Sequence, residues 1–121
     1  MHIQFAELPV FDQDRAKAFY VDNFGRRVAS DAPMGSDGWR WIELRFEGAR
    51  TALHFLRRPD DKPSVEPVLV LVDGDVAGVI EKLRANGVEI VTEPQEAPWE
   101  PGRIVAEFRD SEGNRMVIGS R

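Results

Sequence analysis

The stretch LPVFDQDRAKAFYVDNFG, residues 8–25, decides the fold of this chain. Asp12 can cap the start of a helix, because its carboxylate accepts a hydrogen bond from a free backbone N–H group. Gly25 can end that helix, because glycine takes a left-handed backbone conformation without steric cost. The pattern returns half a chain later, with Asp75 as the cap and Gly87 as the stop. The two glycines lie 62 residues apart (87 − 25) in a chain of 121, which indicates a duplicated unit rather than a solenoid of three or more repeats.

Around the two helices, alternating or continuous apolar residues predict short strands. The expected strands cover residues 2–10, 27–30, 39–47, 51–56, 68–72, 88–91, 103–109 and 115–118. Residues 31–38 and 92–102 are expected to be loops, because proline and glycine interrupt them. Each half of the chain therefore reads β-α-β-β-β.

We expect the whole chain to form a single domain of two modules. The modules cover about 1–58 and 66–121, and a linker rich in proline and acidic residues joins them at about 57–67. A half of about 60 residues buries too little surface to be more than marginally stable alone.

Composition excludes several classes of function. The net charge of −5, from 16 basic and 21 acidic residues, argues against nucleic-acid or anionic-membrane partners, which require a basic face. The absence of cysteine excludes disulfides and thiolate metal sites. The N-terminus shows no signal-peptide pattern, and no apolar run approaches the roughly 20 residues of a membrane span. We therefore expect a cytoplasmic protein.

Two motifs carry a resemblance to a known family. The first is the opening stretch through Asn23-Phe24-Gly25, and the second is Phe108-Arg109-Asp110-Ser111-Glu112-Gly113-Asn114, which is similar to an "F-x-D-P-D-G-N" turn. Together, in this order and with the duplication, they resemble the vicinal oxygen chelate superfamily, which includes glyoxalase I, extradiol dioxygenases and bleomycin- or fosfomycin-resistance proteins. The resemblance covers essentially the whole chain.

The resemblance implies an α+β fold in which two βαβββ modules form a curved, mixed sheet around a cavity. Small relatives often pair as dimers, with the cavity at or near the interface, and an isologous homodimer is also the commonest assembly of small chains. We therefore expect a homodimer. The fold alone does not fix the function.

Metal-dependent members of the superfamily place four ligands, His, Glu or Gln, on cavity-facing strands. Counting from the two motifs puts these positions at Phe5, His54, Pro67 and Val117. Only His54 carries a side chain that can bind a metal, whereas such a site needs about three. We therefore predict no metal and no other cofactor. A divalent metal in an improvised site, built from His54 with Glu7, Glu43 or Glu107, is the alternative.

Alternation along the strands implies a set of cavity-facing residues. These are Phe5, Glu7, Trp39, Trp41, Glu43, His54, Leu56, Leu69, Leu71, Glu107, Arg109 and Val117, and Trp99 on the long loop can close over them. We take Phe5, Glu7, Trp39, Trp41, His54, Trp99, Glu107, Arg109 and Val117 as the ligand-binding set. Aromatic walls with few polar groups are typical of small-molecule pockets. Alternatively, Trp39 and Trp41 fill the core or a dimer interface, and Glu43 and Glu107 only pair with Arg45 or Arg109.

Two functions follow from these residues. In the first, the protein binds a small organic molecule without a metal, for example to sequester an antibiotic, and its negative charge and aromatic walls favour a cationic, partly aromatic ligand. In the second, it is a lyase, isomerase or dioxygenase that uses a displaced metal site, or uses His54 as a general base beside Glu43. His54 can equally be a hydrogen-bonded residue of the wall.

Overall fold

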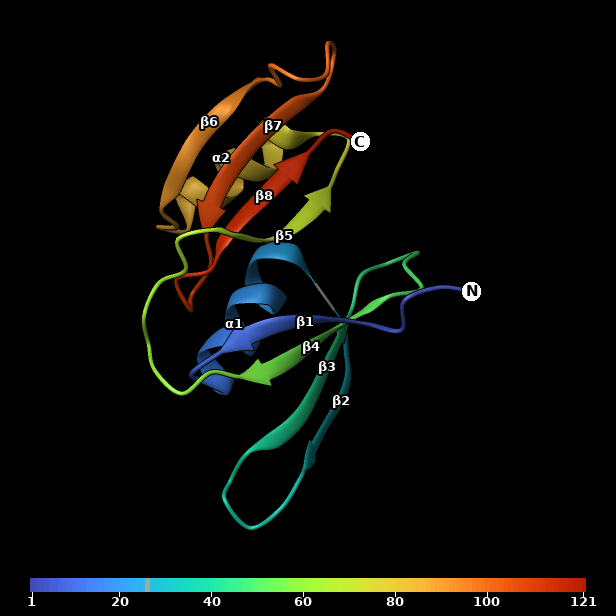
Figure 1. Ribbon diagram of the computed structural model, residues 1–121, viewed down its shortest axis with the longest axis vertical. Coiled ribbons are helices and arrows are strands. Elements are labelled where there is room, and N and C mark those ends of the chain that lie inside the picture. The colour runs from blue at the N-terminus through green and yellow to red at the C-terminus, as the bar shows by residue number, and fades with distance from the viewer. Residues whose placement is uncertain (26) are drawn as a thin grey trace. The chain divides into compact units, whose positions relative to one another are not determined.

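In the computed structural model of the protein, the first helix forms between its predicted cap and its predicted stop (Figure 1). This helix, α1, covers Gln13–Phe24. The Asp12 carboxylate accepts a hydrogen bond of 3.1 Å from the backbone N–H of Arg15. Gly25 ends the helix in the left-handed conformation, with φ at 58°, as glycine does at low cost.

The second helix repeats this construction. It is α2, which covers Val76–Ala85. The Asp75 carboxylate accepts a hydrogen bond of 2.9 Å from the backbone N–H of Gly78, and Gly87 follows with φ at 79°. Both predicted caps and both predicted stops are therefore confirmed.

The chain divides into two compact units, Met1–Asp61 and Lys62–Arg121, and the structure describes residues 1–25 and 27–121. Each unit contains one helix and a four-stranded mixed sheet. The division falls within the segment 57–67. The predicted α+β fold of two βαβββ modules is confirmed, and its strands are divided between two hydrogen-bonded sheets.

The two sheets have the same topology. The strands of the first unit are β1 (Phe5–Val10), β2 (Arg27–Pro33), β3 (Arg40–Arg45) and β4 (Ala52–Arg57), in the order β1-β4-β3-β2. Those of the second are β5 (Pro67–Val72), β6 (Ile90–Glu96), β7 (Ile104–Arg109) and β8 (Arg115–Gly119), in the order β5-β8-β7-β6. In each sheet the first and last strands pair in parallel, and the other pairs are antiparallel.

Two strands are longer than the sequence predicts. Strand β2 continues to Pro33 and β6 to Glu96, so each takes in part of a predicted loop. Both lie at a sheet edge and pair through irregular registers. Polar residues and proline are tolerated in edge strands, so these segments lack the alternation that marks a strand in sequence.

Alternate residues of the first sheet form its core. Leu8 and Val10 on β1 and Ile42 and Leu44 on β3 are fully buried. α1, which contacts β3, contributes buried Ala16 and Tyr20. The residues between these core positions point to the other face of the sheet, which therefore carries Phe5, Glu7, Trp41, Glu43 and His54.

In the second sheet, the prediction that Leu69 and Leu71 face the cavity is wrong. Leu69 pairs with Met116 and Leu71 with Ile118, and both partners are core residues, so the two leucines share the core face. The register shifts between Pro67 and Leu69, and this irregularity inverts the alternation along β5. Val70, which is exposed, instead pairs with Val117.

Candidate functional site

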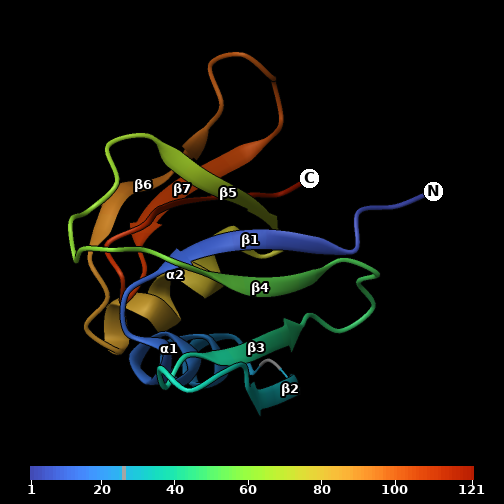
Figure 2. The same ribbon diagram turned by 60° about the horizontal axis from the view of Figure 1, so that its bottom comes forward.

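Three aromatic side chains gather on the non-core face of the first sheet. They come from β1, β4 and β3, which lie side by side in that sheet (Figure 2). The ring centroids of Trp41 and His54 are 3.9 Å apart. Phe5 lies 5.6 Å from Trp41 and 5.7 Å from His54. We call these three residues the aromatic cluster.

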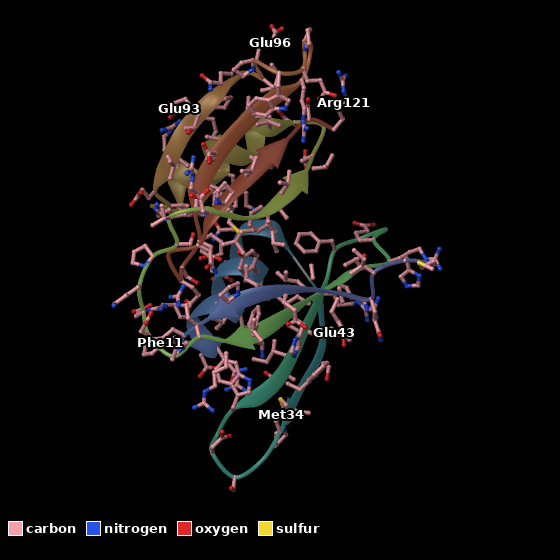
Figure 3. All side chains as sticks on the ribbon, in the orientation of Figure 1. Phe11, Met34, Glu43, Glu93, Glu96 and Arg121 are labelled. Carbon is pink, nitrogen blue, oxygen red and sulfur yellow. The ribbon has the colours of Figure 1, made fainter. Side chains whose placement is uncertain are left out.

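His54 stands at the centre of the cluster because β4 lies between two other strands. Its register partners are Glu7 on the parallel strand β1 and Glu43 on the antiparallel strand β3. The ring nitrogen Nδ1 lies 2.6 Å from a carboxylate oxygen of Glu7. Glu43, which projects from β3 (Figure 3), instead accepts a hydrogen bond of 3.1 Å from Arg45.

Sequence reasoning placed Glu7 on this face but chose Glu43 as the carboxylate beside His54. The pairing with Glu7 depends on β1 and β4 being parallel neighbours, a contact between residues 47 positions apart. For Glu43, the alternative expected from the sequence was an ion pair with Arg45, and the structure contains this ion pair.

The other ring nitrogen of His54 is the unusual feature of the site. His54 is 9% exposed, and its Nε2 atom is buried without a hydrogen-bond partner among the described residues. Buried polar atoms nearly always have partners, and leaving one unsatisfied costs about 1–3 kcal/mol. Nε2 is therefore a nitrogen beside two aromatic rings whose hydrogen bond is not made within the described residues.

The donor set does not fit a metal of the kind that the resemblance implies. Phe5, Pro67 and Val117 offer no lone pair, and Val70, the register counterpart of Glu7 in the second sheet, offers none either. Within residues 1–25 and 27–121, no group of three or more His, Cys, Asp or Glu side chains is arranged to hold a metal ion.

Trp39 lies immediately before β3. The Arg57 guanidinium carbon is 5.2 Å from the centroid of its ring, a cation–π distance. Both side chains line a surface depression of about 330 Å³, together with Phe11, Asp12, Gln13, Asp14, Asp37, Gly38 and Arg40. The Arg57 guanidinium is also 2.7 Å from the Asp37 carboxylate.

The candidate residues of the second unit make structural contacts. Arg109 donates hydrogen bonds of 2.8 Å to the backbone carbonyls of Ser64 and Gly113. Trp99 is 69% exposed, on the loop before β7. Val117 pairs with Glu107, as His54 pairs with Glu43. That these residues bind a ligand stays a prediction.

Glu107 is held by an arginine other than the one expected. Arg115 donates to its two carboxylate oxygens at 2.6 and 3.1 Å, and the Thr92 hydroxyl donates at 2.7 Å. The Arg115 guanidinium holds the pKa of Glu107 below its ordinary value of 4.5, and the Thr92 hydrogen bond acts in the same direction.

This lowered pKa predicts a dependence of stability on pH. A carboxylate with a lowered folded-state pKa stabilises the protein fully above its ordinary pKa, and that stabilisation is lost as the pH falls through the folded-state pKa. Glu107→Gln should therefore cost about 1–2 kcal/mol at neutral pH, and its deficit relative to the wild type should shrink below pH 4.5. Urea denaturation across this range measures both. A deficit that is constant with pH would contradict the assignment.

One structural contact was not predicted at all. The Gln13 side chain donates a 2.6 Å hydrogen bond to the Arg40 carbonyl and accepts a 2.9 Å hydrogen bond from the Arg40 N–H, so it ties α1 to β3. Nothing local in the sequence marks this contact, because the two residues are 27 positions apart.

Comparison with known proteins identifies a family that the sequence matches and a relative of similar length. Residues 2–118 match the family described as Glyoxalase/Bleomycin resistance protein/Dioxygenase superfamily. The uncharacterized protein YetH of Bacillus subtilis (strain 168) is 36% identical over 111 residues, which cover 90% of this chain and 89% of YetH.

Solved structures are similar over nearly the whole chain. TnmS3, an antibiotic binding protein from Streptomyces sp. CB03234, is 31% identical with a TM-score of 0.79, over 98% of this chain and 93% of TnmS3. A superfamily member from Sphaerobacter thermophilus DSM 20745 is 23% identical with a TM-score of 0.83, over 98% and 96% of the two chains, and this match shows the fold. Among the described residues, no helix is both long enough and apolar enough to cross a membrane.

Proposed function

The chain belongs to the Glyoxalase/Bleomycin resistance protein/Dioxygenase superfamily, and we propose that it binds a small aromatic molecule at the aromatic cluster of its first unit. The observation that carries this proposal is the buried Nε2 of His54, which has no hydrogen-bond partner in the part of the chain that the structure describes and lies beside the rings of Trp41 and Phe5. Flat aromatic side chains provide area for stacking on a ligand, and a single polar atom can orient it.

The biological role that we propose is sequestration of an antibiotic or a similar compound. Support comes from TnmS3, an antibiotic binding protein that is 31% identical over nearly the whole chain. The net charge of −5 favours a ligand that carries positive charge in addition to its aromatic part. Binding of this kind needs no metal or other cofactor, and we propose none.

Replacing Trp41 should weaken binding. Trp41→Ala removes the ring nearest to His54, and the loss of one aromatic contact is worth up to about 1.5 kcal/mol, or about tenfold in Kd. Titration calorimetry against a panel of aromatic antibiotics measures this change.

Phe11→Ala is the control, because it removes an aromatic side chain from a position that is 46% exposed and lies outside the proposed ligand-binding set. Equal affinity in the wild type and in Trp41→Ala, for every compound that binds, would refute the role of the cluster.

One observation favours a second function. The Glu7 carboxylate 2.6 Å from His54 Nδ1 is the arrangement that orients a histidine as a general base. In this alternative the protein is a metal-independent enzyme, and Nε2 removes a proton from the substrate. If turnover of any candidate substrate is found, His54→Ala should abolish it, whereas an unchanged rate would exclude this function.

We also propose that the protein is a homodimer, as the superfamily resemblance implies, and that it is cytoplasmic. Analytical ultracentrifugation measures the assembly directly. A sedimenting mass equal to the chain mass of 13.7 kDa at micromolar concentration would refute the dimer.

A further inference from the structure

The bond between His54 and Glu7 determines which ring nitrogen carries the proton. An ionised carboxylate offers only acceptors, so the 2.6 Å contact between Nδ1 and the Glu7 oxygen requires the hydrogen on Nδ1. In the neutral imidazole only one nitrogen bears a hydrogen. In that neutral form Nε2 presents a lone pair, and the Nε2 atom has no hydrogen-bond partner within residues 1–25 and 27–121.

We propose that His54 Nε2 selects ligands that carry an O–H or N–H donor on a flat aromatic ring, and that Glu7 sets this preference by fixing the tautomer. This inference rests on the proposed function and names the ligand class of the same site. A phenol or a related hydroxyarene meets both requirements, because its ring can stack on Trp41 while its hydroxyl donates to Nε2. The same ring without a donor leaves the buried lone pair unsatisfied.

Discrimination of this kind is strong when a binding site contains an unpaired polar atom. A site built to hydrogen-bond a ligand group rejects an analogue that lacks the group, since its own polar atom then stays buried without a partner. The two carboxylates nearby each have a partner of their own, since Glu7 is bonded to Nδ1 and Glu43 accepts from Arg45.

Access to Nε2 depends on the two aromatic neighbours. The atom is closed to solvent, and Trp41 and Phe5 are the rings in contact with His54. Both are partly exposed. Changes of side-chain rotamer at a binding surface are common on complex formation, so a rotation of Trp41 is the expected route by which a ligand reaches the nitrogen.

The test compares β-naphthol with its methyl ether, in which a methyl group replaces the donor hydrogen. Wild-type protein should bind β-naphthol about tenfold more tightly, which corresponds to one hydrogen bond of about 1.4 kcal/mol. His54→Phe keeps a ring in place but removes both nitrogens, so its two affinities should be equal. Glu7→Gln should reduce the preference, because its amide can also donate to Nδ1 and so leave the hydrogen on Nε2.

A measurement on the wild-type protein covers the case in which a variant fails to fold. Nitrogen-15 NMR of the imidazole side chains at mildly alkaline pH reports the tautomer directly. The chain has two histidines, and a His2→Gln variant assigns the signals. We expect the hydrogen of His54 on Nδ1, and finding it on Nε2 would overturn the inference.

The binding outcomes separate the inference from the proposed function. If both probes bind equally and Trp41→Ala weakens both, the inference is wrong while aromatic binding at the cluster stands. If neither probe binds, the inference is again overturned, and the proposed function is then decided by the antibiotic panel. If the wild type prefers β-naphthol and His54→Phe does not, both are supported.

Discussion

Asp110→Ala should lower the free energy of unfolding by about 3 kcal/mol. The Asp110 side chain is buried in the turn between β7 and β8. One carboxylate oxygen accepts the backbone N–H groups of Glu112 at 2.9 Å and Asn114 at 3.0 Å, and the other accepts the Asn114 side-chain amide at 3.1 Å. A hydrogen bond to a charged group is worth about 1.5–3 kcal/mol, and the three share one carboxylate, so their losses do not add fully.

Asp110→Asn is the control for this prediction. Its side-chain oxygen can still accept both backbone N–H groups, so we expect it to lose about half as much stability. Urea denaturation followed by circular dichroism measures both variants. A loss below about 0.5 kcal/mol for Asp110→Ala, which is typical of an unimportant surface position, would show that the carboxylate does not hold this turn.

Phe108→Ala should have a still larger effect, about 3–5 kcal/mol. The ring is fully buried, and Phe108 lies between its register partners Ile90 on β6 and Met116 on β8. Removing the Phe108 ring loses a large buried apolar surface and leaves a cavity. Both effects lower the free energy of unfolding. We expect the unfolding midpoint in urea to fall sharply.

Two further variants show whether burial is the cause of this loss. Phe108→Leu fills much of the space and should cost clearly less than alanine. Phe11→Ala removes the same ring from a position that is 46% exposed, labelled in Figure 3, and should stay within about 1 kcal/mol of the wild type. Equal losses at Phe108 and Phe11 would contradict the packing argument.

The parts of the fold that the sequence predicts are those set by local chemistry. Asp12 and Asp75 cap helices through contacts three residues away, so the information lies within the stretch itself. The edge strands β2 and β6 are longer than predicted because a partner strand supplies their hydrogen bonds. These partners, β3 and β7, are the next strands along the chain, but a polar segment that contains proline has no alternation from which the pairing could be predicted.

The sequence predicted which residues of the candidate site share one face of the sheet, but it predicted fewer of the contacts between them. Strict alternation along β3 placed Trp41 and Glu43 on the same face, because the side-chain period of a strand is two. On β5 every residue from 68 to 72 is apolar, so the pattern could not reveal the register shift that turns Leu69 and Leu71 toward the core. The contact between His54 and Glu7 required knowledge of which strands are neighbours.

The difference between the two sheets bears on stoichiometry. In the first, β1 and β4 bring Glu7 and His54 together, whereas the corresponding pair on β5 and β8 is Val70 and Val117. Of these two corresponding pairs, the first is polar and the second is apolar. Under the proposed function, one chain takes up one ligand molecule, so the expected saturation curve is hyperbolic and cooperativity is expected only between chains.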